Sequence, residues 1–124
     1  MNSNFIKSKG ILASMLQATK NIIAVTMPFN NASDLEKQVI VYDNVYMNLV
    51  IINEAYIKCE EQVRKEIDFI NWNEIIRYAD LMSNDNSANE KEVFYIAKSL
   101  IPRLKSSLDS ILSDNFSVND EKNE

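Results

Sequence analysis

A seven-residue apolar repeat runs through the middle of this chain and limits the folds that the chain can adopt. Apolar or aromatic residues recur every seven positions at Leu35, Tyr42, Leu49, Tyr56, Val63 and Ile70, and Val39, Tyr46 and Ile67 each follow four residues after a member of that series. This spacing is typical of a helix that packs against another helix along one seam. A continuous helix over residues 33–70 would be about 55 Å long, which is longer than a 124-residue globule needs.

The seam loses its apolar character in its second half. Asn53 and Glu60 stand where the repeat would place apolar side chains, while Ile52 and Cys59 continue an apolar stripe beside them. Asn53 fits a polar residue that fixes the register of a coiled coil, and it equally fits a point where the helix turns another face inward. The two polar positions together favour a packing partner that changes along the helix.

The scarcity of glycine and proline argues against a β fold. One Gly and two Pro in 124 residues leave almost none of the tight turns that β-hairpins and phosphate-binding loops require. We therefore predict an all-α fold, a helical bundle or antiparallel coiled-coil hairpin with a long central helix and a small C-terminal helical knob. Hydrophobic residues make up 46% of the chain and charged residues 25%, which suffices for a packed core.

The N-terminal segment carries a single apolar stripe. Between about Ser3 and Met27 the apolar side chains recur at spacings of three, four and seven, which predicts a first helix that ends near Pro28. Ser33 and Glu36 then have the spacing of a capping box, in which each side chain satisfies a backbone amide of the first helical turn. The central helix is expected to start there.

The C-terminal part is predicted to form shorter helices. Asn71 and Glu74 repeat the spacing of a capping box in front of a helix from Trp72 to Met82. The following Asn/Ser-rich stretch is expected to be a loop. A further helix begins after it, capped by Ser87 or by Asn89 in our prediction.

Pro102 lies inside the apolar pattern of that last helix. Because proline cannot donate a hydrogen bond to the preceding turn, we expect a kink or a break near Ile101, with Pro102 opening a final helix. The predicted organisation is then a coiled-coil hairpin over residues 1–70 and a helical knob over residues 71–116. Residues 117–124 are predicted to form a disordered acidic tail.

The charge balance and the single cysteine restrict the partners and the compartment. A net charge of −5 without a Lys/Arg run argues against direct nucleic-acid binding, because the phosphate backbone requires a clustered basic surface. The lone Cys59 cannot form an internal disulfide, which fits a reducing compartment such as the cytosol or nucleus. Residues 11–27 are too polar for a membrane span and lack the features of a signal peptide. A soluble protein without a membrane partner is expected.

No combination of side chains predicts catalysis. The chain has no histidine, which excludes Ser-His-Asp, Cys-His and HExxH sites. Cys59 is expected to pack as a small buried hydrophobe. The acidic residues nearby have basic neighbours and are expected to form a solvated face; they are Glu60, Glu61, Glu66 and Asp68. We assign no catalytic, cofactor-binding or metal-binding residue and expect no small-molecule substrate.

The residues of the seam are the predicted partner-binding surface. Tyrosine at such positions buries its ring and keeps its hydroxyl in water, which suits an interface between protein helices. The predicted contact residues are Leu35, Val39, Tyr42, Tyr46, Leu49, Tyr56, Val63 and Ile67. On this interpretation Leu49→Asp would weaken partner binding more than Glu61→Ala, since only Leu49 lies on the seam.

The most specific stretch of the sequence follows the central helix. It reads Asn73-Glu74-Ile75-Ile76-Arg77-Tyr78-Ala79-Asp80-Leu81-Met82-Ser83 and continues with small and polar residues to Ala88. Together with the helix before it, this stretch resembles the fourth subunit of the eukaryotic Mediator complex, in which a long coiled-coil helix precedes a segment of the type Glu-Ile-Ile-Lys-Tyr-Ala-His-Arg-Ile-Ser. The matching positions are Glu74, Ile75, Ile76, Tyr78, Ala79 and Ser83, and Arg77 keeps the basic charge.

The resemblance covers about residues 46–88. The chain departs from the family pattern at Asp80, where the family has histidine, and at Leu81, which replaces an arginine. A Trp/Pro-rich segment that commonly follows is missing. A capped amphipathic helix in any small bundle would also bury Ile75, Ile76 and Ala79, whatever the function of that bundle.

The resemblance implies a non-enzymatic scaffold subunit of the Mediator middle module. Such a subunit would act in the nucleus as a coactivator of RNA polymerase II transcription, through coiled-coil contacts with other subunits. An alternative is a small helical-bundle inhibitor or immunity protein of bacterial or phage origin, which sequesters one target protein in the bacterial cytoplasm. The Asn- and Lys-rich, Gly-poor composition suits an AT-rich genome of either kind.

Overall fold

The computed structural model describes residues 3–83 and 88–115, and every regular element in these ranges is helical. The elements are α1 (Ser3–Thr26), the 3₁₀ turn η1 (Ala32–Leu35), α2 (Val39–Lys58), α3 (Glu61–Glu66), α4 (Trp72–Ser83), α5 (Glu90–Tyr95), the π-helical segment η2 (Ile96–Leu100) and α6 (Ile101–Asn115). No strand occurs between residues 3 and 83 or between residues 88 and 115. The predicted all-α class is therefore confirmed.

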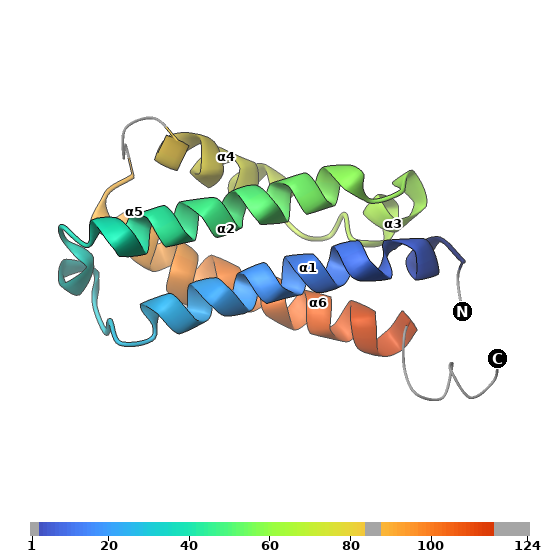
Figure 1. Ribbon diagram of the computed structural model, residues 1–124, viewed down its shortest axis with the longest axis horizontal. Helices are drawn as coiled ribbons and strands as arrows, with labels where there is room; N and C mark the ends of the chain where they lie inside the picture. Colours follow the sequence, from blue (N-terminus) through green and yellow to red (C-terminus); the bar gives the residue numbers. More distant parts are fainter. Residues whose placement is uncertain (1–2, 84–87, 116–124) are drawn as a thin grey trace.

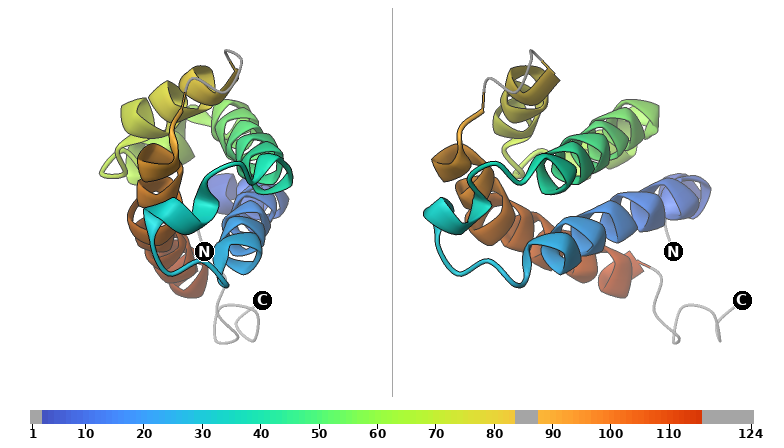
Figure 2. Two further views of the ribbon diagram at one scale, coloured as in Figure 1. Left: turned by 90° about the vertical axis from the view of Figure 1, so that its left-hand side faces the viewer. Right: turned by 60° about the vertical axis from the view of Figure 1, so that its left-hand side comes forward.

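The longer helices surround a single core. Figure 1 shows α1 and α2 side by side and running in opposite directions. In the end-on view of Figure 2, α1, α2, α4 and α6 lie around a common centre. α2 packs against α1 and α4, and α6 packs against α1. Fully buried side chains from all these helices meet between them, among them Leu12, Met15, Leu49, Ile52, Ile75 and Leu108.

The part of the chain after residue 71 is not set apart from the hairpin. α4 packs along α2, and α6 packs along α1, so these helices complete the bundle that α1 and α2 begin. Leu104 and Leu108 of α6 belong to the same core cluster as Leu12 of α1. This differs from the predicted division into a hairpin over residues 1–70 and a knob over residues 71–116. The predicted tail over residues 117–124 lies outside the described residues.

The long central helix expected over residues 33–70 is interrupted twice, and its last helical piece ends early, at Glu66. Lys37 has a positive φ of 65° between η1 and α2, and Cys59 and Glu60 are extended between α2 and α3. Neither break contains glycine or proline, the local signals from which a break would be predicted. The second break turns α3 so that Val63 is fully buried against the bundle. Core packing, rather than local preference, therefore sets the length of α2.

The start of the central segment also differs from the prediction. Asn31 is the cap of η1, and its Oδ1 accepts hydrogen bonds from the Asp34 amide at 3.1 Å and from the Ser33 hydroxyl at 2.6 Å. The first turn therefore starts after Asn31 and ends at Leu35. Ser33 and Glu36 do not form the expected capping box, because Ser33 already lies inside this turn.

Two other predicted helix starts are confirmed. At α4, Asn71 Oδ1 accepts a hydrogen bond from the Glu74 amide at 3.2 Å. At α5, Asn89 is the cap; its Oδ1 accepts from the Glu92 amide at 3.0 Å, and its own amide donates to Glu92 Oε1 at 3.2 Å. Ser87, the other predicted cap, lies outside the described residues. Each cap satisfies an amide that has no partner within the helix, which stabilises the helix by about 1 kcal/mol.

Pro102 is accommodated without a break in the helix. α5, η2 and α6 form one helical run from Glu90 to Asn115, and the π-helical segment ends two residues before the proline, at Leu100. In that segment the Ile101 amide donates to the carbonyl of Ile96, five residues earlier. A proline ring would crowd the carbonyl four residues before it in a regular α-helix, so the wider turn relieves that contact. The expected irregularity near Ile101 thus takes the form of a π-helical turn.

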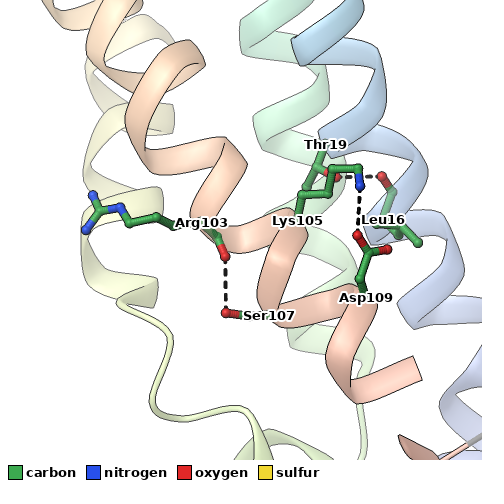
Figure 3. Close-up of polar contacts among 6 residues, drawn as sticks. All are labelled: Leu16, Thr19, Arg103, Lys105, Ser107 and Asp109. Carbon is green, nitrogen blue, oxygen red and sulfur yellow. Dashed lines mark hydrogen bonds and ion pairs between the residues drawn. The ribbon is translucent and has the colours of Figure 1, made fainter. Parts of the chain in front are cut away.

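α6 lies against α1 in the region drawn in Figure 3. The Thr19 hydroxyl of α1 is buried and donates to the Leu16 carbonyl at 2.7 Å. Beside it, Lys105 and Asp109 of α6 form an ion pair at 2.7 Å. Both polar contacts stay within their own helix. The packing between α1 and α6 therefore depends on apolar side chains, as expected for a bundle core.

Candidate functional site

α2 is apolar on the side that faces solvent as well as on the side that faces the core. Its buried residues are Val41, Val45, Asn48, Leu49, Ile52 and Ala55. On the opposite side the exposed fractions are 83% for Ile40, 61% for Met47, 61% for Ile57, 58% for Val39 and 40% for Ile51. A surface helix normally carries polar residues there. We refer to these five residues, together with the half-buried Val50, as the outer face of α2.

Helical spacing aligns the outer face in two rows. Ile40, Met47 and Ile51 form one row at spacings of seven and four, and the second row consists of Val39, Val50 and Ile57. These spacings bring side chains to one side of a helix, here over a length of about 27 Å. Since α1 and α4 pack on the core side of α2 (Figure 2), most of the outer face is not covered by the described residues.

Two carboxylates lie between the apolar rows. Asp43 and Glu54 are both exposed and stand eleven residues apart, or about 16 Å along the helix. The ion pairs within residues 3–83 and 88–115 join other side chains, so neither carboxylate is neutralised there. Lys58, at the C-terminal end of α2, is the nearest cation in the sequence on this side. The outer face is therefore apolar with two acidic points.

Five exposed apolar side chains on one helix are more than the scattered apolar residues that are usual on a protein surface. Large apolar patches on soluble proteins are often interaction sites. Withdrawing one exposed isoleucine or methionine fully from water contributes about 1.5–3 kcal/mol. The outer face thus holds enough apolar surface to support binding of another helix.

The predicted seam residues occupy three different environments. Those that are fully buried are Leu35, Leu49, Val63 and Ile67, and those that are half-buried against the core are Tyr42, Tyr46 and Tyr56. Val39 alone is exposed. A partner could touch the four buried residues only if the bundle opened. The seam therefore packs the chain's own core, and of the predicted contacts only Val39 belongs to the outer face.

The register between α1 and α2 is fixed by an amide, but not by Asn53. Asn21 of α1 donates a hydrogen bond to Asn48 Oδ1 at 3.1 Å, and the buried Asn48 amide group donates to the Asn44 carbonyl at 2.8 Å. Asn53 is only half-buried, while Ile52 beside it is fully buried. The second interpretation of Asn53 therefore holds: the helix turns another face inward at this point.

The side chains of the family-like motif on α4 mainly make internal contacts. Ile75, Tyr78 and Ala79 are buried and Ile76 is half-buried, so three of these positions belong to the core. The exposed Arg77 places its guanidinium carbon 4.3 Å from the centroid of the Tyr78 ring. These contacts agree with the simpler reading of α4 as a capped amphipathic helix.

The remaining motif residues make local or interhelical hydrogen bonds. The Ser83 hydroxyl donates to the Asp80 carbonyl at 2.7 Å. Glu74 accepts a hydrogen bond of 2.6 Å from the Tyr95 hydroxyl, which in turn accepts one of 2.9 Å from Arg103. The bond to Glu74 is the main reason why the pKa of Tyr95 is raised, and burial adds to it. This chain of bonds ties α4 to α5 and α6.

Cys59 packs in the core as predicted, with 3% of its surface exposed. Burial raises the pKa of its thiol, and the nearby Arg64 opposes this only in part. A raised pKa disfavours the thiolate, which is the nucleophilic form of cysteine. The environment of Cys59 is thus that of a packing residue.

We also searched the described residues for a metal site, a cavity and a membrane-spanning helix. Within residues 3–83 and 88–115 no group of three or more cysteine or acidic side chains is arranged to hold a metal ion. An open hollow of about 480 Å³ beside α6 is lined by Glu66, Phe69, Asp114 and three serines. No helix in the described part of the chain has the length and apolar character needed to cross a membrane.

No protein-family model, curated protein or solved structure matches this chain. We therefore infer the function from the surface itself. The seven-residue repeat did not reveal the outer face, because a repeat follows one side of a helix. A usable signal was nevertheless present, since Asp43 and Glu54 are the only charged residues between Val39 and Ile57. A helix that is apolar all round is normally covered on all sides.

Proposed function

We propose that this chain is a non-enzymatic docking protein whose outer face of α2 packs against a helix of another protein. The exposure of Ile40 and Met47 on a well-packed helix is the observation that carries the proposal. A partner helix laid along the two rows would remove both side chains from water. Apolar anchors at spacings of three, four and seven residues are a common means of helix recognition.

The way α2 is held in the bundle supports this role. Leu49 and Ile52 are fully buried on its core side, and the Asn21–Asn48 hydrogen bond fixes its position along α1. These contacts hold α2 in one orientation, with its outer face toward solvent. A rigid binding surface loses little conformational entropy on binding, which leaves more of the apolar contribution for affinity.

Two specific forms of this role remain proposals. In the first, which the family resemblance implies, the chain is a scaffold subunit in the Mediator middle module and the outer face contacts a neighbouring subunit. In the second, the chain is a bacterial or phage inhibitor that sequesters one target protein. Both forms use the same face of α2, and they differ in the set of proteins bound.

Affinity capture of the tagged full chain from its own cells tests the proposal. We expect Met47→Asp to lower recovery of the bound proteins by about tenfold or more, because the charge would lie in the apolar contact. Met27→Asp is a matched control, since Met27 is 66% exposed, against 61% for Met47, and lies outside α2. Mass spectrometry identifies the bound proteins.

The result separates the two forms and also tests docking as such. Recovery of many transcription subunits by the wild-type chain would support the scaffold form, and recovery of one unrelated target would support the inhibitor form. If the wild-type chain and both variants recovered the same proteins in equal amounts, the outer face would not be the docking surface.

A further inference from the structure

We infer that the outer face of α2 takes a basic amphipathic helix of another protein and not a second copy of this chain. The inference rests on the proposed docking function and concerns the chemistry of the partner. Its basis is the position of Asp43 and Glu54 between the apolar rows, because any helix that covers the rows must also pass these two carboxylates.

An antiparallel pairing of two copies would oppose like charges. Full overlap of the two α2 helices, Val39–Lys58, centres the pair between Asn48 and Leu49, which sets Ile40 level with Ile57 of the second copy and Met47 level with Val50. The same register sets Asp43 level with Glu54 of the second copy. By symmetry this happens twice. The pairing with full overlap of α2 thus also brings four carboxylates into two like-charged pairs, which disfavours it.

A parallel pairing has the same defect. Two parallel copies in register place each residue beside its own counterpart, so Asp43 meets Asp43 and Glu54 meets Glu54 of the second copy. Like charges that face each other across a helix pair are unfavourable. Parallel pairing in register therefore also brings carboxylates of the two copies together.

The shifted register that pairs Asp43 with Lys58 does not favour self-association. Moving the antiparallel centre to a point between Val50 and Ile51 would bring Asp43 level with Lys58 of the second copy, a favourable pair. The same shift sets Glu54 level with Met47, which places a carboxylate against an apolar side chain. It also carries Ile40, the most exposed residue of the outer face, past the end of the second α2 at Lys58.

A different helix with basic residues meets all these requirements. Such a helix would span about 18 residues, carry an apolar stripe, and present Lys or Arg about eleven residues apart, opposite Asp43 and Glu54. The absence of an ion pair at either carboxylate within the described chain leaves both available for such contacts. The two acidic points then select the partner by charge, while the apolar rows supply most of the affinity.

Two synthetic peptide probes test this inference on the full chain. Both are 18-residue helical peptides with the same leucine stripe, one carrying two lysines eleven residues apart and the other two glutamates at the same positions. By fluorescence anisotropy we expect the lysine peptide to bind about tenfold more tightly or better, with a smaller advantage at high salt. The double variant Asp43→Lys, Glu54→Lys should reverse the preference, and Met47→Asp should weaken binding of both peptides.

The outcomes distinguish the partner chemistry from the docking function. Equal binding of both peptides, lost in Met47→Asp, would overturn the basic partner and keep the docking surface. Binding of neither peptide would count against both proposals. A wild-type dimer in sedimentation experiments that dissociates in Met47→Asp would show that a second copy covers the outer face, and this would overturn the inference. Circular dichroism spectra equal to wild type establish that the variants, all at exposed positions, are folded.

Discussion

Leu49→Asp is expected to destabilise the fold strongly. Leu49 is fully buried between α2 and its neighbours, and a carboxylate at that position would lose its water without gaining a partner. We expect a loss of at least about 4 kcal/mol, compared with a total stability of about 5–15 kcal/mol for a domain of this class. Urea denaturation followed by far-UV circular dichroism measures the change.

The control for this experiment keeps the volume of the side chain. Leu49→Met should cost less than about 1.5 kcal/mol, because it conserves shape and apolar character. The experiment also shows whether Leu49 packs in the core of this chain or against another protein. A folded Leu49→Asp variant with wild-type stability that had lost its partner would mean that Leu49 faces another protein, and the described core packing would be contradicted.

Trp72→Ala is expected to cost about 3–5 kcal/mol of stability, through loss of a large buried ring. Trp72 is 6% exposed and stacks on Tyr56 with ring centroids 4.2 Å apart and an interplanar angle of 22°. Its indole nitrogen donates to the Ile67 carbonyl at 2.9 Å. The side chain thus ties α2 to α4 and to the segment between α3 and α4. Urea denaturation gives the change in unfolding free energy.

A second substitution separates the ring from the hydrogen bond. Trp72→Phe keeps an aromatic ring against Tyr56 but removes the indole donor to the Ile67 carbonyl, which then accepts only from the Ile70 amide at 3.2 Å, and we expect a cost of about 0.5–1.5 kcal/mol. The order wild type, Trp72→Phe, Trp72→Ala should therefore hold in the denaturation midpoints. A midpoint for Trp72→Ala within error of wild type would show that this contact does not hold the bundle together.

Local sequence signals correctly predicted that the elements are helices and where several of them begin or end. Asn71 and Asn89 cap helices as expected, because a cap depends on residues three positions apart and on nothing distant. The end of α1 at Thr26 lies one residue from the predicted Met27. Even at this level Asn31 replaced Ser33 as the cap of η1, since neighbouring polar residues can serve one turn equally well.

Features that depend on the whole bundle could not be predicted in this way. The breaks at Lys37 and Cys59 arise where neighbouring helices require the chain to turn, and no local residue marks them. The seam residues Leu35, Leu49 and Val63 were recognised as packing positions, but whether they pack within the chain or against a partner is a question of topology. The helices that pack against these segments, α1, α4 and α5, are not encoded in the repeat itself.

The exposed side of α2 was missed for a related reason. Heptad spacing identifies one packed side, and it counts Ile40 and Met47 as off the seam. Only after the core side is known do these residues become an outer face. The core side also shows where Asp43 and Glu54 lie. Their eleven-residue spacing places both carboxylates among the exposed apolar side chains.

The central claim is that another protein covers the outer face of α2 in the cell. Site-specific photo-crosslinking in living cells tests it most directly, with a photoreactive amino acid placed at Met47 and, in a separate chain, at the equally exposed Met27. The account predicts a crosslinked protein from position 47 and none, or far less, from position 27. A crosslink from position 27 with none from position 47 would contradict it.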